Sequence, residues 1–467
     1  MQRRPSSSPS RVTHPCHHIA RNRSLRLAAL KLALLACMPM AVQALDLTQA
    51  FEAALEQDAT IRSVRAATEA RRERLPQARA QLLPSVSATA SRFRNSLDRQ
   101  APDFFGQIIN SDERYTSSSE ALSLKQPIFR PALMADYRQA QAQVDDANSI
   151  LERELQNVAV RVSTAYFESL LAEEQLALVL SQKASYTVQL DAAQQRLQRG
   201  SGTRTDVDEA RAGLDLSTAQ ELEARQGIEL TRRQLQSLVN RPIDTLARID
   251  PQRLELQPPS PDNLAAWTER AERASPELQS ARAQVEVARQ EAEKAQAGHY
   301  PTLDAIAQWS RNNNESVTTL RNRYTNRAIG LQLNVPLYQG GYVQSTVRQA
   351  LANQTRAEEA LEALRRDLGV RIHREFRGVT EGVLRVKALE QAVKSAEQVV
   401  ASNRRSFDAG SRTLPDIFSA EQSRVSAMRD LAQARLVYLL SRIRLQALSG
   451  GDRVEAIRQV NGWLIGP

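Results

Sequence analysis

The chain has 467 residues, a length that by itself suggests two or three domains, but only 4% of its residues are aromatic. Long stretches rich in Ala, Gln, Arg, Leu and Glu favour long helices packed through narrow seams over wide globular cores. The net charge of +9 does not indicate nucleic-acid binding, because seven positive charges lie within residues 1–44 and the remainder of the chain carries only +2.

Residues 1–44 have the pattern of an export signal. A basic segment without acids precedes the apolar run LALLACMPMAVQA, which ends in the small-residue pattern Val42-x-Ala44. The run is too short to cross a bilayer as a helix. The sequence LLAC, ending at Cys37, loosely resembles a lipobox, and cleavage before Cys37 would leave a lipidated N-terminus instead. Either cleavage removes Cys16, and the ordinary one leaves no cysteine for a disulfide.

The exported part contains two copies of one order of secondary-structure elements. Each copy has two short segments around a polar loop, a long helical stretch, a glycine-centred break and another helix. In ALSLKQP and AIGLQLNVP, apolar and polar residues alternate, which predicts strands with two different faces. PSVSATASRFR and TLDAIAQWSR are their expected partners. The polar segments Asn95–Tyr115 and Arg311–Arg327 are predicted to be solvated hairpin tips.

The stretch after each hairpin predicts a very long helix. No proline interrupts the 68 residues of Ala132–Arg199 or of Tyr342–Ala409. At ~1.5 Å per residue, each would form a helix of roughly 100 Å. Apolar residues recur at spacings of three and four, so we expect coiled-coil-like packing rather than a globular core.

Four strands in one chain would leave two unpaired sheet edges. The strands are about nine to eleven residues long, which is the length a tilted strand needs to cross a bilayer. Only a closed barrel satisfies all backbone groups there, and four strands cannot enclose a useful lumen, so the barrel would be shared between protomers. Trp309 and Tyr324 are candidates for the membrane interfaces, or for simple packing within a hairpin.

The breaks after the long helices, at LQRGSGTRTDVDEA and FDAGSRTLPDIFSA, are 210 residues apart. Gly200 and Gly410 suit the C′ position of a helix end, where a left-handed backbone conformation favours glycine. The Thr-x-x-Asp sequences that follow, from Thr203 and Thr413, resemble capping boxes. On the purely structural interpretation, their aspartates only cap the next helix.

Several stretches resemble the TolC family of outer-membrane channels over residues 45–450. They are LDLTQAFEAAL, LLPSVSA, ALSLKQPIF, LNVPLYQGG and AGSRTLPDIFSAEQSRVSAMRDLAQARLVYLLSRIRLQALSG. The resemblance implies a mainly α fold with a small β part: four transmembrane strands per chain in a shared 12-stranded trimeric barrel, continued by long antiparallel helical hairpins. The implied segments are a signal peptide (1–44), a first repeat (45–240), an equatorial connector (241–275), a second repeat (276–450) and a C-terminal tail (451–467).

The family implies a function as well. Its members are exit ducts of type I secretion systems and tripartite pumps, in the outer membrane and extending into the periplasm. They are homotrimers that dock an inner-membrane ABC or RND transporter through a periplasmic adaptor protein. No enzyme activity, cofactor, metal or nucleic acid is expected, since the exported chain keeps only His299 and His373, without a ligand or nucleophile pattern. The alternative is a soluble periplasmic coiled-coil scaffold or adaptor.

The resemblance also implies that the two turns form a closed periplasmic aperture. By position, Asp206 and Arg412 match an acid–arginine pair of the lock between adjacent coiled coils, and Thr205 matches a second polar member. Phe407 stands where the family has a tyrosine, so one hydrogen bond of that lock is missing. Asp416 matches one aspartate of a ring that constricts the pore and attracts cations.

At the companion position of that ring this chain has Ser419. A trimer would therefore hold three carboxylates instead of six, and we expect a more easily opened gate. The remaining turn residues are the expected hairpin tips and adaptor docking points: Gly200, Gly202, Gly410 and Ser411.

Overall fold

The computed structural model describes residues 44–102, 104–313 and 322–465. The predicted export signal, including Cys16 and Cys37, lies outside the described residues except for Ala44. The same is true of residues 314–321 in the expected tip of the second hairpin.

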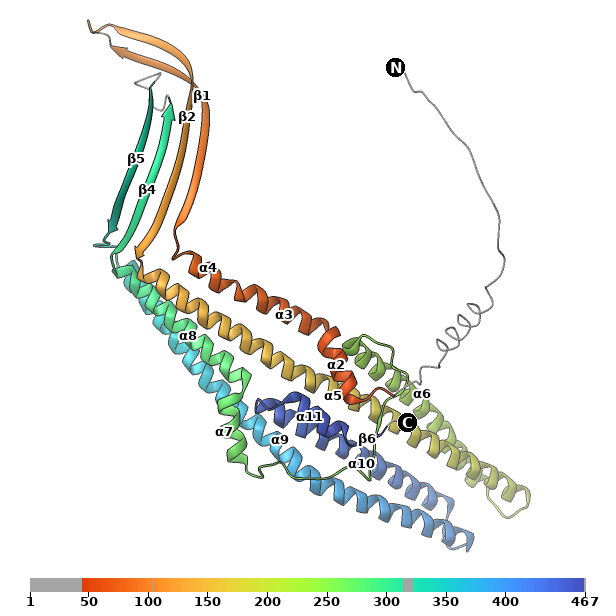
Figure 1. The fold of residues 1–467 in the computed structure, drawn as a ribbon. Coiled ribbons are helices and arrows are strands. Elements are labelled where there is room, and N and C mark those ends of the chain that lie inside the picture. Colours follow the sequence, from red (N-terminus) through yellow and green to blue (C-terminus); the bar gives the residue numbers. More distant parts are fainter. Residues whose placement is uncertain (1–43, 103, 314–321, 466–467) are drawn as a thin grey trace, which may run out of the picture. The chain divides into compact units, whose positions relative to one another are not determined.

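Four strands form one antiparallel sheet in the order β1-β2-β4-β5 (Figure 1). They are β1 (Ser85–Pro102), β2 (Ile108–Phe129), β4 (Thr302–Asn313) and β5 (Arg323–Asn334). All four predicted strands are confirmed, and within the described residues β1 and β5 are the edges of this sheet.

The prediction of a loop over Asn95–Tyr115 is wrong. Asn95 and Tyr115 are instead partners in the β1–β2 ladder, and the pairing continues to Pro102 and Ile108. The polar residues of this segment are compatible with a strand, and ladder pairing satisfies their backbone N–H and C=O groups. The second predicted loop is also shortened, because β4 continues to Asn313 and β5 begins at Arg323.

The sheet has an apolar face and a polar face. Directly opposed residues of antiparallel neighbours share a face, and one such row is Val86, Leu124, Ala307 and Ile329. We call this face the apolar face; its other members are Ala88, Leu122, Phe129, Leu303, Ala305, Trp309, Leu331 and Leu333. The opposite, polar face carries rows such as Ser87, Ser123 and Gln308, or Ser91, Ser119, Asn312 and Tyr324.

Trp309 and Tyr324 therefore point to opposite sides of the sheet. Trp309 lies on the apolar face, in keeping with an interfacial role, whereas Tyr324 lies on the polar face. The apolar face is well exposed within the chain: Ile329 is 90% exposed and Leu331 is 68% exposed.

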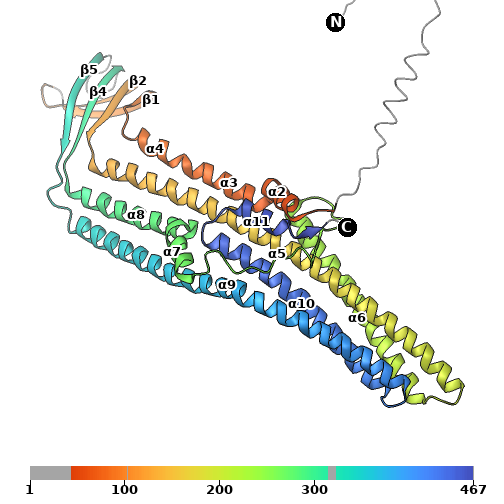
Figure 2. The same ribbon diagram turned by 60° about the horizontal axis from the view of Figure 1, so that its bottom comes forward.

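Two long helices follow the hairpins and confirm the prediction from the absence of proline. They are α5 (Pro131–Gln198) and α9 (Tyr342–Asp408). Each turns back into a shorter antiparallel helix, α6 (Arg204–Val239) or α10 (Leu414–Leu448). Figures 1 and 2 show the two helical hairpins side by side, with their turns at the end farthest from the sheet.

Shorter elements complete the helical part. Helices α2 (Leu47–Gln57), α3 (Ala59–Arg72) and α4 (Arg74–Ala80) pack along α5. Helix α8 (Pro276–Gln296), reached through α7 (Leu264–Ala274), packs on α5 and α9 and leads through η1 (Ala297–His299) to the sheet. Each half thus has helices, a strand pair, a long helix and a shorter helix in the same order.

A buried tyrosine and the C-terminal segment connect the elements in the middle of the helical part. Tyr166 is fully buried and its hydroxyl donates to the carbonyls of Leu45 and Ala247, both at 2.9 Å. Strand β3 (Arg248–Ile249) pairs with β6 (Leu464–Ile465), which follows α11 (Arg453–Asn461). No helix among the described residues combines the length and the apolar character that membrane crossing requires.

Candidate functional site

The turns at the ends of the helical hairpins have the same backbone geometry. Gly200 (φ 74°) and Gly410 (φ 75°) adopt the left-handed conformation expected at C′. The N–H of each glycine donates to the carbonyl three residues earlier, at 3.0 and 2.9 Å. The N–H of the next residue, Ser201 or Ser411, donates to the carbonyl five residues earlier, at 3.0 and 2.9 Å. These are the two bonds of a Schellman motif, so the turns end α5 and α9 in a fixed direction.

In the first turn, Gly202 and Asp206 fix the start of α6. A Cβ atom on Gly202 would lie 2.9 Å from the Cβ of Arg196, so the chain passes too closely for a larger residue. The carboxylate of Asp206 accepts hydrogen bonds from the N–H (3.0 Å) and hydroxyl (2.7 Å) of Thr203. The N–H of Asp206 donates back to the Thr203 hydroxyl at 3.2 Å, which completes the predicted capping box.

In the second turn, Asp416 has the same role at the start of α10. Its carboxylate accepts bonds from the N–H (2.9 Å) and hydroxyl (2.8 Å) of Thr413 and lies 3.4 Å from the Arg412 guanidinium. The backbone bond from Thr413, its hydroxyl and the charge of Arg412 lower the pKa of Asp416. The carboxylate is therefore ionised over the whole neutral range.

Asp206 and Arg412, the expected lock pair, do not contact each other within the chain. Asp206 is bonded to Thr203, and Arg412, in the second turn, pairs with Asp416 at the start of α10. Thr205 is exposed beside Asp206. Since the lock is expected to join neighbouring coiled coils, these three side chains stay candidates for contacts between protomers.

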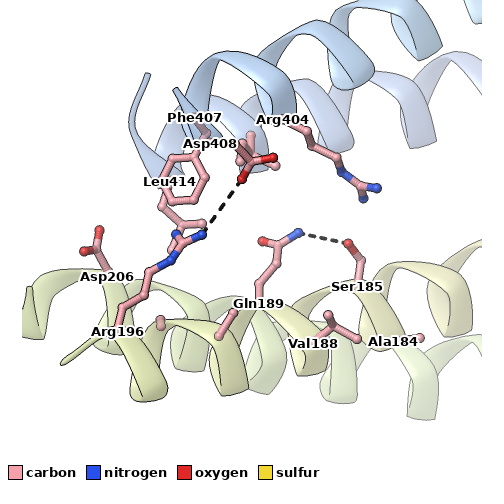
Figure 3. A pocket seen from close by; sticks show the side chains of 13 residues that line it. Ala184, Ser185, Val188, Gln189, Arg196, Asp206, Arg404, Phe407, Asp408 and Leu414 are labelled. Carbon is pink, nitrogen blue, oxygen red and sulfur yellow. Dashed lines mark hydrogen bonds and ion pairs between the residues drawn. The ribbon is translucent and has the colours of Figure 1, made fainter. Parts of the chain in front are cut away.

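Phe407 joins the two hairpins within the chain. It packs against an apolar cluster of Ala210, Leu414 and Ile417, which come from α6 and α10. The guanidinium of Arg196, on α5, lies 4.5 Å from the centroid of the Phe407 ring. Arg196 also reaches the carboxylate of Asp408 at 4.0 Å (Figure 3).

These side chains line a groove of about 500 Å³ between α5 and the second hairpin (Figure 3). Arg196 and Asp206 lie at its end near the turns, and Ala184 and Ser185 lie toward the other end. Its wall mixes apolar side chains with arginine and carboxylate groups.

Sequence reasoning missed the contacts that connect the hairpins. Besides Arg196, they include Tyr186, whose ring lies 5.0 Å from that of Phe418 and closely against Gly213. Within the second hairpin, Glu421 of α10, only 4% exposed, accepts a hydrogen bond from Arg404 of α9 at 2.5 Å. Gly213 on α6 leaves room for the ring of Tyr186 on α5, and this glycine within a helix is the one indication of the contact in the sequence.

The model of a family described as outer membrane efflux protein matches residues 50–241 and 267–451 of the chain. The chain belongs to the outer membrane efflux protein family. Family membership confirms the resemblance found in the sequence and the expected outer-membrane location with an extension into the periplasm.

Known relatives cover nearly the whole chain. The alkaline protease secretion protein AprF of Pseudomonas aeruginosa is 33% identical over 409 residues, 87% of this chain and 85% of AprF. The proteases secretion protein PrtF of Dickeya chrysanthemi is 28% identical over 442 residues, 94% of this chain and 95% of PrtF. The outer membrane protein TolC of Escherichia coli is 28% identical over 438 residues, 91% of this chain and 86% of TolC.

Solved structures share the fold. VceC from Vibrio cholerae superposes with a TM-score of 0.74 at 19% identity and covers 87% of this chain and 96% of its own. The Campylobacter jejuni CmeC outer membrane channel also gives 0.74, at 16% identity and 89% coverage of both chains. The predicted fold class, mainly helical with a small β part, is confirmed; the closure of the strands into a barrel remains a prediction.

Proposed function

We propose that this family member is a homotrimeric outer-membrane channel, the exit duct of a type I secretion system. Three chains would contribute four strands each to one barrel, and their helical hairpins would continue it as a tunnel through the periplasm. The tunnel would open at its periplasmic turns when an adaptor and an inner-membrane transporter dock there.

The observation that carries this proposal is the two-faced sheet with open edges. A row such as Val86, Leu124, Ala307 and Ile329 exposes apolar side chains that suit lipid, while the opposite face is lined by serine, asparagine and glutamine. β1 and β5 lack a second neighbour within the described part of the sheet. Copies of the chain joined edge to edge would satisfy both strands and enclose a polar lumen.

The height of the apolar face supports the same interpretation. From the row of Phe129 and Leu303 to the row of Leu122 and Trp309 it spans six residue steps of β4, about 20 Å at ~3.4 Å per residue. This approaches the apolar band of about 25 Å that transmembrane barrels carry. A soluble periplasmic scaffold or adaptor, the alternative considered from the sequence, has no use for such a face and is not favoured by family membership.

The hairpin turns are the proposed gate. We propose that Asp206, Thr205 and Arg412 link neighbouring protomers and that the Asp416 carboxylates form a cation-attracting ring. The side chains that would form these links are exposed or half-buried within one chain. The surrounding turns, with Gly200 and Gly410 at their centres, would receive the adaptor.

Protein secretion is the favoured cargo class because AprF and PrtF, by name, serve protease secretion. An efflux role is the second candidate, because the matching family is described as outer membrane efflux protein and BepC of Brucella suis, 24% identical over 302 residues, is by name an outer membrane efflux protein. The ABC transporter of a secretion system would then be the inner-membrane partner, in place of an RND pump.

The test combines location, assembly and conductance. Outer-membrane fractions should contain a heat-sensitive trimer that conducts ions across a planar lipid bilayer after purification. Ile329→Arg, on the apolar face, should impair insertion at a cost of up to about 2–4 kcal/mol, whereas Ala328→Arg, on the polar face, should be tolerated. A soluble monomer, or equal effects of the two substitutions, would contradict the channel.

A further inference from the structure

The apolar face of the sheet continues beyond its apolar rows, and there it carries arginines. The ladder places Arg327 opposite Trp309, at the end of the apolar rows farthest from the helices. Six arginines occupy this face at and beyond that row: Arg92, Arg94, Arg114, Arg311, Arg323 and Arg327. All six are exposed, and none has a carboxylate within ion-pair distance among the described residues. We call them the arginine patch.

The excess of positive charge is confined to this face. Over the same rows it carries three acids, Glu120, Asp98 and Asp112, against six arginines. The polar face over these rows has one arginine, Arg99, and one acid, Glu113. General solubility at a strand end would not concentrate the cations on one side of the sheet.

We infer that the arginine patch binds the phosphate groups of outer-leaflet lipid in the outer membrane. The inference rests on the proposed function, because it takes the apolar face to be the lipid-facing surface of a barrel. With the helices in the periplasm, the sheet end that carries the patch meets the outer leaflet. Arginine suits this role, since its planar fork binds phosphate oxygens in pairs and stays charged at any physiological pH.

The patch is continuous with the apolar face, and this favours a lipid over free phosphate. The row of Arg92, Ser118, Asn313 and Arg323 crosses all four strands. At ~4.8 Å between neighbouring strands, the row spans about 14 Å. A lipid with two phosphates and several acyl chains can place its chains on Leu331 and Ile329 while its phosphates meet the arginines. The arginines are exposed on an open sheet face, which does not enclose an isolated phosphate.

The experiment compares three variants of the full-length trimer in detergent. One replaces Arg92, Arg94 and Arg311 by Gln, the second replaces the same residues by Lys, and the third is Arg99→Gln on the polar face. Each is titrated with lipid A carrying two phosphates, with its monophosphoryl form and with inorganic phosphate, and bound lipid is counted by native mass spectrometry. All replaced side chains are exposed, so folding should be retained.

Each arginine near an anionic lipid surface contributes about fivefold to binding, so the triple Gln variant should bind lipid A about 100-fold more weakly. The triple Lys variant keeps the charge but loses the fork, so it should bind more tightly than the triple Gln variant and less tightly than the wild type, and Arg99→Gln should match the wild type. The monophosphoryl form should bind less tightly than the form with two phosphates. Unchanged binding by the triple Gln variant, or equal competition by millimolar inorganic phosphate, would overturn the inference.

Conductance separates this inference from the channel function. In bilayers of phosphatidylcholine alone, the wild type and the triple Gln variant should conduct equally. If both conduct and lipid A binding is unchanged by the substitutions, only the lipid inference fails. If neither conducts, the channel function fails and the lipid inference fails with it.

Discussion

The guanidinium of Arg196 lies over the ring of Phe407, 4.5 Å from its centroid, and so connects the ends of two helical hairpins. Arg196 comes from the last turn of α5 and Phe407 from the last turn of α9. The same arginine reaches Asp408, so one side chain makes both a cation–π and an ionic contact across the groove. The two hairpins of one chain are therefore held together close to the proposed gate.

Removal of the Phe407 ring should loosen the hairpin ends. Phe407→Ala removes the cation–π contact and the packing of a half-buried ring, together about 2 kcal/mol. Amide hydrogen exchange in the last two turns of α5 should then become about 30-fold faster. Phe104→Ala, which removes a ring that is 98% exposed at the far end of the sheet, serves as the control and should change nothing there.

Substitution of Gly410 should be unfavourable because of its backbone conformation and not because of steric crowding. Its φ of 75° disfavours side chains, although a methyl group at this position would meet nothing within 4 Å. Gly410→Ala should destabilise the turn by about 1 kcal/mol, and Gly410→Asn by less. Hydrogen exchange of the turn amides measures both.

Gly227 provides the matched comparison. It lies inside α6, where a methyl group also meets nothing within 4 Å. Gly227→Ala should stabilise that helix by about 0.5–1 kcal/mol. Equal effects at the two glycines would contradict a special role for the left-handed turn.

The long elements could be predicted from the sequence because their signals are local. Absence of proline predicted α5 and α9, and two-residue alternation in AIGLQLNVP predicted β5. The extension of β1 and β2 through Asn95–Tyr115 was missed because polar residues are compatible with a loop and with a solvated strand. The polar composition indicates that these residues are solvated, but hydrogen bonding to the neighbouring strand sets their backbone conformation.

The contacts of the candidate site could be predicted only in part. Both turns were expected because glycine and Thr-x-x-Asp act within a few residues. The pairing of Arg196 with Phe407 depends on how two separate hairpins pack, and no local pattern encodes it. A contact between Asp206 and Arg412 depends on a neighbouring protomer, so neither local pattern nor the single chain decides it.

Acid should weaken the anchoring of α3 to α5. Asp58, only 4% exposed, pairs with Arg161 at 2.6 Å and accepts from the N–H of Thr60 at 2.8 Å. Burial raises its pKa, but the bonds from Thr60 and Arg161 outweigh burial, so the net pKa is lowered. The folded state therefore favours the carboxylate, and its contribution is complete above the unfolded pKa of about 3.9 and lost as pH falls through the folded value.

Thermal unfolding should thus shift downward below about pH 4. Asp58→Asn keeps the cap on α3 but removes the charge, so it should cost about 1–2 kcal/mol at pH 7 and reduce the acid shift. Asp58→Ala also removes the cap and should cost about 1 kcal/mol more. If Asp58→Asn shows the same decrease of the unfolding temperature in acid as the wild type, that decrease arises from other carboxylates.

Restoring a second acid should strengthen cation block of the pore. Ser419 is exposed three residues after Asp416, one turn along the same helix. Ser419→Asp should raise the ring to six carboxylates and lower the half-blocking concentration of a divalent cation about tenfold or more. Ser419→Asn, similar in size but uncharged, should block like the wild type. Equal block in all three channels would contradict the placement of position 419 in a cation-attracting ring.

Loss of Arg412 should open the gate without unfolding the turn. Among the residues that the structure describes, Arg412 pairs with Asp416 alone, in an exposed ion pair of a kind that adds little stability. Arg412→Ser should therefore leave the turn intact, while the proposed link to Asp206 of a neighbouring protomer is lost. The open probability of single channels in a planar bilayer should rise.

Arg405 supplies the control for this experiment, because it is an exposed arginine on α9 whose guanidinium donates to Ala401 on the same helix. Arg405→Ser should not change the open probability. Asp206→Asn should raise it as Arg412→Ser does, and the double variant should gain nothing further, because both changes remove one interaction. If Arg412→Ser leaves the open probability unchanged, Arg412 and Asp206 do not form the lock.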